Sequence, residues 1–255
     1  MNSPGLLIHP VTDLPLVRSG DNLALLIGTA CDRVGFALQD GDVLVLAQKI
    51  VSKAEGRQVL LADVEASPEA VKLAKEVDKD PRLVELVLRE SDTIIRKTRG
   101  VLIVRHRLGI VSANAGIDQS NISHDEGESA LLLPLDPDQS ARRLRADFAA
   151  DHNLNLGIII SDSINRPWRM GTVGIAIGSA GITVLDDRRG QADMFGRELK
   201  VTMINRADSI ATAAMLVMGE TTERVPAAIV RGFPAENSSQ GAADSLRPLA
   251  EDLFR

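Results

Sequence analysis

Short apolar runs alternate with helix-like apolar spacings along this chain, and together they predict a mixture of strands and helices. Val43–Leu46 is a continuous apolar run, which is typical of a strand buried on both faces. Four glycines lie among β-branched residues at 171–182, which indicates a strand whose backbone is approached closely by its neighbours. Further strands are predicted at 6–11, 57–64, 93–96, 101–106, 109–112, 156–161 and 226–230.

Helix starts are marked by capping residues and prolines. Ser67-Pro68-Glu69 combines a capping side chain with proline at the first helical position, so it predicts a helix to about Val77. Gly219 stands where a cap glycine belongs after a helix over 205–218. Further helices are predicted at 21–37 with Asp21 as cap, at 81–89, at 138–152 starting from Asp138, and at 244–254.

The order of these elements decides the fold class. Strands follow one another closely between residues 93 and 112, and helices come in groups. This arrangement favours an α+β fold, with mixed or antiparallel sheets and flanking helices, over a doubly wound parallel sheet. The 255 residues are enough for one large domain or two small ones.

Composition excludes several classes of protein. Acidic residues outnumber basic ones by 35 to 29, and the chain has five Phe, one Trp and no Tyr, so neither a basic nucleic-acid surface nor a base-stacking platform is expected. A single cysteine excludes an internal disulfide and a cysteine-rich zinc site. No apolar run reaches the roughly 20 residues of a membrane span, and the start lacks a secretory leader pattern. We expect a cytoplasmic protein with no membrane or nucleic-acid partner.

The familiar catalytic motifs are missing. The sequence has no phosphate loop of the G-x-x-x-x-G-K-[ST] type, no G-x-G-x-x-G fingerprint and no G-x-S-x-G elbow. The four histidines show no metal-ligand spacing. Nucleophilic triads and the common nucleotide folds are therefore unsupported.

Acidic residues after apolar stretches are the remaining candidates for chemistry. Asp118 lies in a loop rich in Asn and Ser, and Asp162 is predicted at the end of the strand 156–161, where a side chain can face a cleft. Carboxylates with hydroxyls suit hard ions such as Mg²⁺ or Mn²⁺. Turn chemistry alone also explains both loops. Arg166 and Arg169 follow Asp162 and suit a substrate carboxylate or phosphate, or they only neutralise Asp162.

Lys49 and Lys53 follow the buried strand 43–46. Residues four apart share one face whether the segment is helical or extended. The two lysines therefore predict a basic spot in an acidic protein, and two solvated lysines are the alternative.

Five ordered segments resemble one family, the coenzyme F420-0:L-glutamate ligases, also called γ-glutamyl ligases. The segments are HPVTDLPLVRSGDNL (9–23), GDVLVLAQKIVSKAEGR (41–57), GIVSANAGIDQSN (109–121), SDSINRPWRMGTVGIAIG (161–178) and MLVMGETTERVPAAIVRG (215–232). The resemblance covers about residues 5–252 and implies one ligase domain, with two subdomains as an open alternative. It also implies the stand-alone form without an appended nitroreductase-like domain, and an intertwined homodimer.

The resemblance implies a GTP-dependent amide ligase that adds L-glutamate to coenzyme F420-0, and then further γ-linked glutamates, through an acyl phosphate. The implied metal is Mg²⁺ or Mn²⁺, with K⁺ as a further candidate. The implied metal ligands are Asp118, Asp162, Ser163 and Glu220. The implied GTP contacts are Leu14, Pro15, Leu16, Val17, Gln48, Lys49, Lys53, Asn121, Met218, Gly219, Glu220, Thr221, Thr222, Glu223, Arg224 and Val225.

Three positions depart from the family pattern. Asn165 and Arg224 stand where relatives often have glycine, and Gln48 stands where many have serine. These departures motivate an alternative, a GTP- and metal-dependent amide ligase for a different carboxylate acceptor. A non-catalytic nucleotide-binding dimer is a third hypothesis. No residue is identified as general base for the glutamate amine.

Overall fold

The computed structural model describes residues 5–165, 167–233 and 236–253, and its chain divides into two compact units. Unit 1 contains Met1–Leu16, Asn22–Gln48 and Asp136–Ser245. Unit 2 contains Val17–Asp21, Lys49–Leu135 and Leu246–Arg255. Each unit is thus assembled from separate stretches of chain.

Unit 1 is built on a mixed sheet. Within the described ranges its strand order is β1-β12-β2-β8-β9, and only the β2–β8 pair is parallel. The predicted apolar run Val43–Leu46 lies in the central strand β2, and its four residues are fully buried. This mixed arrangement confirms the expected α+β class. The strands are β1 (Leu7–Pro10), β2 (Val43–Ala47), β8 (Gly157–Asn165), β9 (Thr172–Ala180) and β12 (Ala227–Arg231).

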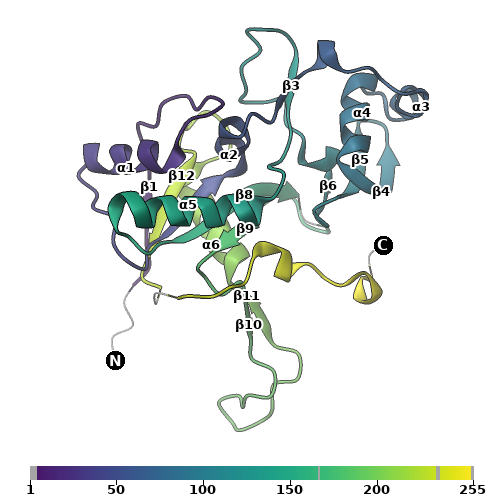
Figure 1. Ribbon diagram of the computed structural model, residues 1–255. Coiled ribbons are helices and arrows are strands. Elements are labelled where there is room, and N and C mark those ends of the chain that lie inside the picture. The colour runs from purple at the N-terminus through teal and green to yellow at the C-terminus, as the bar shows by residue number, and fades with distance from the viewer. Residues whose placement is uncertain (1–4, 166, 234–235, 254–255) are drawn as a thin grey trace. The chain divides into compact units, whose positions relative to one another are not determined.

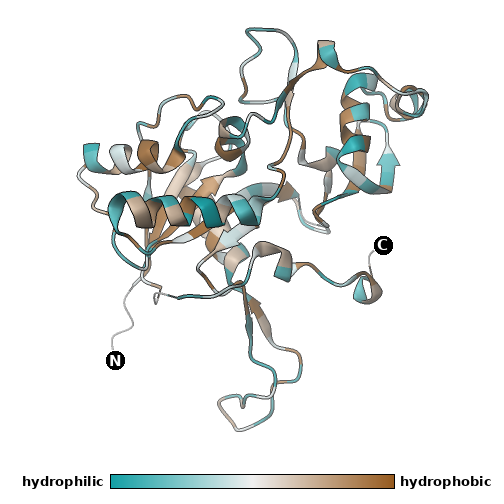
Figure 2. Ribbon diagram, viewed as in Figure 1, coloured by the Kyte–Doolittle hydropathy of each residue, from teal (hydrophilic) through white to brown (hydrophobic). Residues whose placement is uncertain are grey.

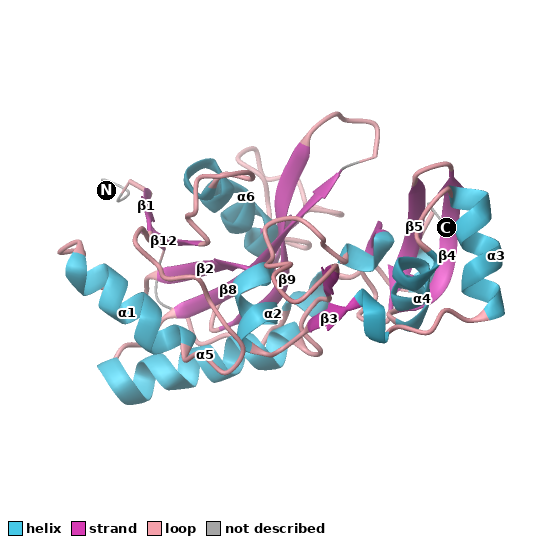
Figure 3. Cartoon of the chain, turned by 90° about the horizontal axis from the view of Figure 1, so that it is seen from above, coloured by secondary structure: helices cyan, strands magenta, loops and turns pink. Residues whose placement is uncertain are grey.

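Helices cover both faces of this sheet. Helices α1 (Leu23–Arg33) and α5 (Pro137–His152) lie on one side, and α6 (Arg206–Met218) lies on the other (Figure 3). Ile210 and Ala214 of α6 pack against Val45 and Ile159 of the sheet. In Figure 2 helix α5 shows alternating hydrophilic and hydrophobic bands, as a helix with one buried side should.

A long hairpin arm projects from Unit 1. Strands β10 (Leu185–Asp187) and β11 (Met203–Asn205) pair in antiparallel fashion, and the segment between them extends away from the five-stranded sheet (Figure 1). Met194, Phe195 and Val201 in this segment are each at least 86% exposed. The arm therefore exposes three large apolar side chains to water.

Two glycines of β9 let other backbone segments approach the strand closely. A Cβ atom at Gly174 would lie 2.7 Å from the carbonyl oxygen of Ala211 in α6, and one at Gly178 would collide with the Pro137 backbone at the start of α5. The close approach predicted from the glycines of 171–182 is therefore confirmed. These glycines allow helices to lie directly on both faces of the strand.

Unit 2 places two helices against small sheets. Its core joins Leu73 and Val77 of α3, Val84 and Val87 of α4, and Leu102 of β5. Antiparallel pairing gives one sheet of order β4-β5-β6 and a two-stranded sheet of β3 and β7. The elements are α2 (Gln48–Ala54), β3 (Gln58–Leu60), α3 (Pro68–Val77), α4 (Pro81–Arg89), β4 (Ser91–Thr98), β5 (Val101–His106), β6 (Val111–Ala113) and β7 (Ser129–Leu131).

A buried ionic cluster holds the end of α4. The carboxylate of Glu90 lies 3.0 Å from both Arg57 Nη2 and Arg107 Nη2. Burial alone would raise the pKa of Glu90, but hydrogen bonding by His106 and the charges of Arg57 and Arg107 bring this pKa below its usual value. The cluster ties α4, β5 and the segment before β3 together through one charged group.

Several predicted boundaries are wrong. The first helix ends at Arg33 and not near residue 37, because Gly35 takes a φ of 70° and Phe36 N–H bonds back to the Cys31 carbonyl. Its cap is Asn22 and not the predicted Asp21, whose side chain instead accepts from Arg18 N–H. Helix α5 is capped by Asp136, one residue before its first.

Two predicted elements are interrupted. The strand predicted at 57–64 stops after Leu60 and gives way to a 3₁₀ turn, Leu61–Asp63. The helix predicted at 244–254 is replaced by two 3₁₀ turns, Ala242–Ser245 and Leu249–Glu251. Pro248 lies between them, and proline disfavours helical backbone in the residue before it and removes a helical donor.

None of the helices that the structure describes has the length and apolar character to cross a membrane.

The glycine contacts of β9 give a stability prediction. Gly178→Ala should lower the free energy of unfolding by about 1–3 kcal/mol, because the new methyl group forces β9 and the Pro137 backbone apart. Gly5→Ala is the matched control, since a Cβ atom there meets nothing within 4 Å. Urea unfolding of both variants measures the difference, and an unchanged midpoint for Gly178→Ala would contradict the packing described.

Candidate functional site

Helix α2 carries the two predicted lysines. Strand β2 ends at Ala47 and helix α2 begins at Gln48, whose side chain is buried. Lys49 and Lys53 follow on α2, so the helical alternative for this segment is correct and the lysines lie one turn apart. Both side chains are partly exposed.

A tight turn presents Asp118. Asn114, Ala115 and Gly116 all have positive φ, and Ala115 is fully buried. After this turn the backbone of Asp118 is fixed by two hydrogen bonds to Leu131, N–H to carbonyl at 3.0 Å and carbonyl to N–H at 2.8 Å. The Asp118 backbone is therefore held as firmly as a strand residue, while its carboxylate is about 28% exposed.

Two lysine contacts join helix α2 to Asp118 and to the loop that follows it. Lys49 Nζ lies 2.8 Å from Asp118 Oδ2, and Lys53 Nζ donates to the carbonyl of Asn121 at 2.7 Å. Burial, and then the charge of Lys49, lower the pKa of Lys53. We call Lys49, Lys53, Asp118 and Asn121 the lysine–aspartate cluster. It combines two cations with one carboxylate, which is a suitable arrangement for an anion together with a metal ion.

The loop after Asp118 is fastened by a residue that the sequence analysis missed. Nδ1 of His124 accepts from Ser129 N–H at 3.1 Å, and its Nε2 lies 3.0 Å from the Gln119 carbonyl. Accepting at Nδ1 makes Nε2 the donor in the neutral ring. His124 thereby bridges the two ends of the loop that carries Asn121. A lone histidine in a polar loop carries no sequence signal for this role.

Asp162 does not lie at a strand end, so that expectation is wrong. Strand β8 continues to Asn165, and Asp162 pairs with Ile175 of β9 inside the hairpin. The polar residues of this segment resemble a loop in sequence, but they form the part of β8 that extends beyond the buried core. Ser163 N–H donates to Asp162 Oδ1 at 2.9 Å. Successive strand residues point to opposite faces, so the side chains of Asp162 and Ser163 do not share a face.

The tip of the β8–β9 hairpin is exposed. Arg169 is exposed there, beside Trp168, which has a φ of 59° and is 82% exposed. Arg166, the other arginine predicted to bind a substrate carboxylate or phosphate, lies outside the described residues. The role of both arginines stays a prediction.

The segment after α6 forms a compact exposed turn. Gly219 caps the helix with a φ of 72°, and Glu220 is exposed just after it. The carboxylate of Glu223 accepts from Thr221 N–H at 2.7 Å, and hydrogen bonds from its own backbone N–H and then from that of Thr221 lower the pKa of Glu223. Arg224 has a φ of 57°, so it adopts the left-handed backbone that a glycine in its place would favour.

The remaining predicted residues lie at the N-terminal segment. Leu14 is partly buried, Leu16 is 73% exposed and Val17 is buried. The boundary between the two units falls between Leu16 and Val17.

The predicted site residues are thus divided. Asp118, Asn121, Lys49 and Lys53 come together in Unit 2, whereas Asp162, Ser163, Glu220 and residues 218–225 belong to Unit 1. No three His, Cys, Asp or Glu side chains gather as a metal-binding group in the part of the chain that the structure describes. The four metal ligands therefore stay a prediction, with Asp118 in one unit and its proposed co-ligands in the other.

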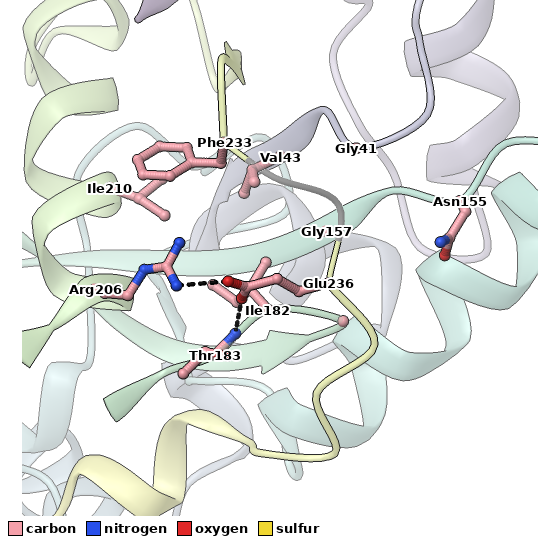
Figure 4. A pocket seen from close by; sticks show the side chains of 11 residues that line it. Gly41, Val43, Asn155, Gly157, Ile182, Thr183, Arg206, Ile210, Phe233 and Glu236 are labelled. Atoms are coloured by element: carbon pink, nitrogen blue, oxygen red, sulfur yellow. Dashed lines mark hydrogen bonds and ion pairs between the residues drawn. The ribbon is translucent and has the colours of Figure 1, made fainter. Parts of the chain in front are cut away.

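A small pocket in Unit 1 is separate from these residues. Glu236 reaches into it, accepting from Arg206 at 2.5 Å and from Thr183 N–H at 2.6 Å (Figure 4). Burial raises the pKa of Glu236, but these hydrogen bonds outweigh it and lower the pKa overall. None of the predicted site residues is among those that line the pocket. Its ion pair serves to join α6 to the segment after β12.

Comparison with known proteins assigns the family. The sequence profile described as F420-0:Gamma-glutamyl ligase matches residues 12–232. The chain belongs to the F420-0:gamma-glutamyl ligase family. A relative named coenzyme F420:L-glutamate ligase, from Methanothermobacter thermautotrophicus, is 44% identical over 253 residues, which cover 98% of this chain and 99% of the relative.

Other members of the ligase family are nearly as similar. The relative of the same name from Methanopyrus kandleri is 43% identical over 99% of this chain and 98% of its own length. The one from Archaeoglobus fulgidus is 41% identical over 97% and 96%. The resemblance of the five sequence segments to this family is confirmed, and the chain is an enzyme of the ligase type.

The lysine–aspartate cluster of this ligase gives a titration prediction. Lys49→Gln should raise the pKa of Lys53 toward its ordinary value, because one of its two causes, the charge of Lys49, is removed. Burial, the larger cause, remains, so the recovery should be partial. The ¹³Cε shift of Lys53 followed with pH measures it, and Lys72→Gln on the exposed side of α3 is the charge-matched control. A fall in the pKa of Lys53 in Lys49→Gln would disprove the coupling.

Proposed function

We propose that this protein joins the amine of L-glutamate to a carboxylate of coenzyme F420-0 and uses GTP to activate that carboxylate. Family membership and the names of its relatives support the ligase reaction and its two substrates. The observation that carries the GTP-dependent part is the lysine–aspartate cluster, where Lys49 and Lys53 lie beside Asp118 and Asn121.

The chemistry of amide formation explains why such a cluster is useful. A carboxylate is a poor electrophile, because oxide is a very bad leaving group. In the proposed reaction a carboxylate oxygen of F420-0 bonds to the γ-phosphorus of GTP, and GDP leaves. The glutamate nitrogen then bonds to the acyl carbon, inorganic phosphate leaves with the C–O bonding pair, and the amine loses a proton. Both steps need positioning and charge neutralisation more than a protein nucleophile.

Both lysines have the same proposed part in binding the nucleotide. The ammonium groups of Lys49 and Lys53 would neutralise phosphate oxygens as point charges. The burial that lowers the pKa of Lys53 also strengthens its attraction to an anion, because fewer waters screen the charge. We extend the proposed GTP site to Leu14–Val17, Gln48 and residues 218–225.

A divalent ion, Mg²⁺ or Mn²⁺, is proposed at Asp118, Asp162, Ser163 and Glu220, with K⁺ as a further candidate. The donor set suits such hard ions. Asp118 supports the fit directly, because its carboxylate already holds a positive group, the Lys49 ammonium, at 2.8 Å. When bound, the ion would offset the charge of the phosphate oxygens and orient them.

A homodimer is also proposed, in the cytoplasm. The exposed apolar residues of the β10–β11 arm support a protein contact, since Met194, Phe195 and Val201 are each more than 85% exposed. Burying such side chains against a second copy would remove the largest apolar side chains of the arm from water.

A ligase for a different carboxylate acceptor is the second candidate. The turn after Glu220 favours it, because Arg224 there adopts the backbone of a glycine but carries a long charged side chain. A panel of acceptor acids, each tested for GTP consumption with glutamate present, separates the two candidates.

A turnover assay tests the proposed reaction. With F420-0, GTP, Mn²⁺ and L-glutamate, the product should gain the mass of one or more glutamate residues. Asp118→Asn and Asp162→Asn should each lower kcat by at least about 100-fold, because each removes charge stabilisation at the phosphates. Asp147→Asn, on the exposed side of α5, is the matched control. Full activity in either site variant would refute its metal role.

The dimer has its own test. Light scattering coupled to size-exclusion chromatography should give about twice the chain mass of 27.3 kDa. Phe195→Asp should shift the protein toward the single-chain mass, since it places a charge in the proposed contact. Arg197→Gln on the same arm changes the net charge by the same one unit and controls for the charge alone. If the wild-type protein has the single-chain mass at micromolar concentration, the proposed homodimer is wrong.

A further inference from the structure

We propose that Lys49 is an exchangeable counter-ion that occupies the cation site of Asp118 until nucleotide arrives, so that metal and GTP bind cooperatively. This inference rests on the proposed function and specifies how the site is regulated. The motivating observation is that one side chain with a proposed phosphate role, Lys49, is bonded to the carboxylate with the proposed metal role.

The contact between Lys49 and Asp118 occupies one oxygen of the Asp118 carboxylate. Lys49 Nζ lies 2.8 Å from Asp118 Oδ2, which is hydrogen-bond distance. An ammonium group has three donors and no acceptor, so it uses the same oxygen lone pairs that a divalent ion needs. A cation that binds Asp118 through Oδ2 must therefore compete with Lys49 for that oxygen.

The two partners differ in freedom to move. The Asp118 backbone is fixed by two hydrogen bonds to Leu131, so the carboxylate can move only by rotation of its short side chain. Lys49 carries its charge on a flexible four-carbon side chain that is 26% exposed. The exchange therefore moves Lys49 and leaves Asp118 in place.

The neighbouring charge makes the exchange depend on an anion. Lys53 is fixed on the same face of α2 by its bond to the Asn121 carbonyl. A metal ion alone would release Lys49 beside Lys53 and add positive charge to a site with two cations. A polyphosphate that arrives with the metal supplies negative charge for both lysines. Each ligand thus removes a cost of binding the other, which is positive coupling.

Binding of Mn²⁺ alone to the nucleotide-free full chain tests the proposal without catalysis. Calorimetry should show Lys49→Gln binding Mn²⁺ about three- to tenfold more tightly than wild type, because the competing ammonium is gone. Lys49→Arg retains the charge and should bind as wild type does. Lys72→Gln, with the same loss of charge on an exposed position of α3, should also match wild type.

The coupling itself is the second measurement. In wild type a non-hydrolysable GTP analogue should tighten Mn²⁺ binding, and the ratio of the two affinities should shrink in Lys49→Gln. Thermal unfolding of each variant confirms that the fold is retained. Equal or weaker binding of Mn²⁺ by Lys49→Gln would overturn the inference.

Asp118→Asn separates this inference from the proposed metal site. If Asp118→Asn weakens Mn²⁺ binding while Lys49→Gln has no effect, the metal assignment stands and only the exchange fails. If Asp118→Asn binds Mn²⁺ as wild type does, Asp118 is not a ligand, and both the metal assignment and the exchange are wrong.

Discussion

The ion pair between Lys49 Nζ and Asp118 Oδ2 is the interaction on which the candidate site depends. Both residues belong to Unit 2, and each has a regular backbone conformation. Lys49 lies in helix α2 and carries its charge at the end of a flexible four-carbon side chain. The backbone of Asp118 is fixed by its two hydrogen bonds to Leu131.

The sequence was informative where local physics decides the structure. Ser67 and Pro68 start α3, and Asp80 and Pro81 start α4, because caps and prolines act on their own helix. It misplaced Asp162, because a polar strand that extends past the core carries the composition of a loop. The Lys49–Asp118 contact joins residues far apart in the chain, so no local pattern could pair them. The family resemblance supplied those residues as a set, and the structure supplied the contact.

Two departures from the family pattern show that a change of residue type need not change the backbone conformation. Arg224 keeps a left-handed φ of 57° despite its side chain, and the hydrogen bonds that the Glu223 carboxylate accepts from Thr221 hold the turn before it. Asn165 does not need a left-handed backbone, since it is the last residue of β8 and pairs with Thr172. Arg224 thus preserves the left-handed backbone at an energetic cost. Asn165 lies at a strand position that any residue with strand propensity could occupy.

Strand β12 has a consequence for how the molecule is made. It lies between β1 and β2, and its residues 227–231 come late in the chain. During synthesis β1 has no partner until β12 has been made, because its described pairing is with β12 alone. Until then, β2 exposes an apolar edge that other chains can join. The main sheet therefore cannot be completed before β12 is available, and a protein shortened before residue 227 would be prone to aggregate.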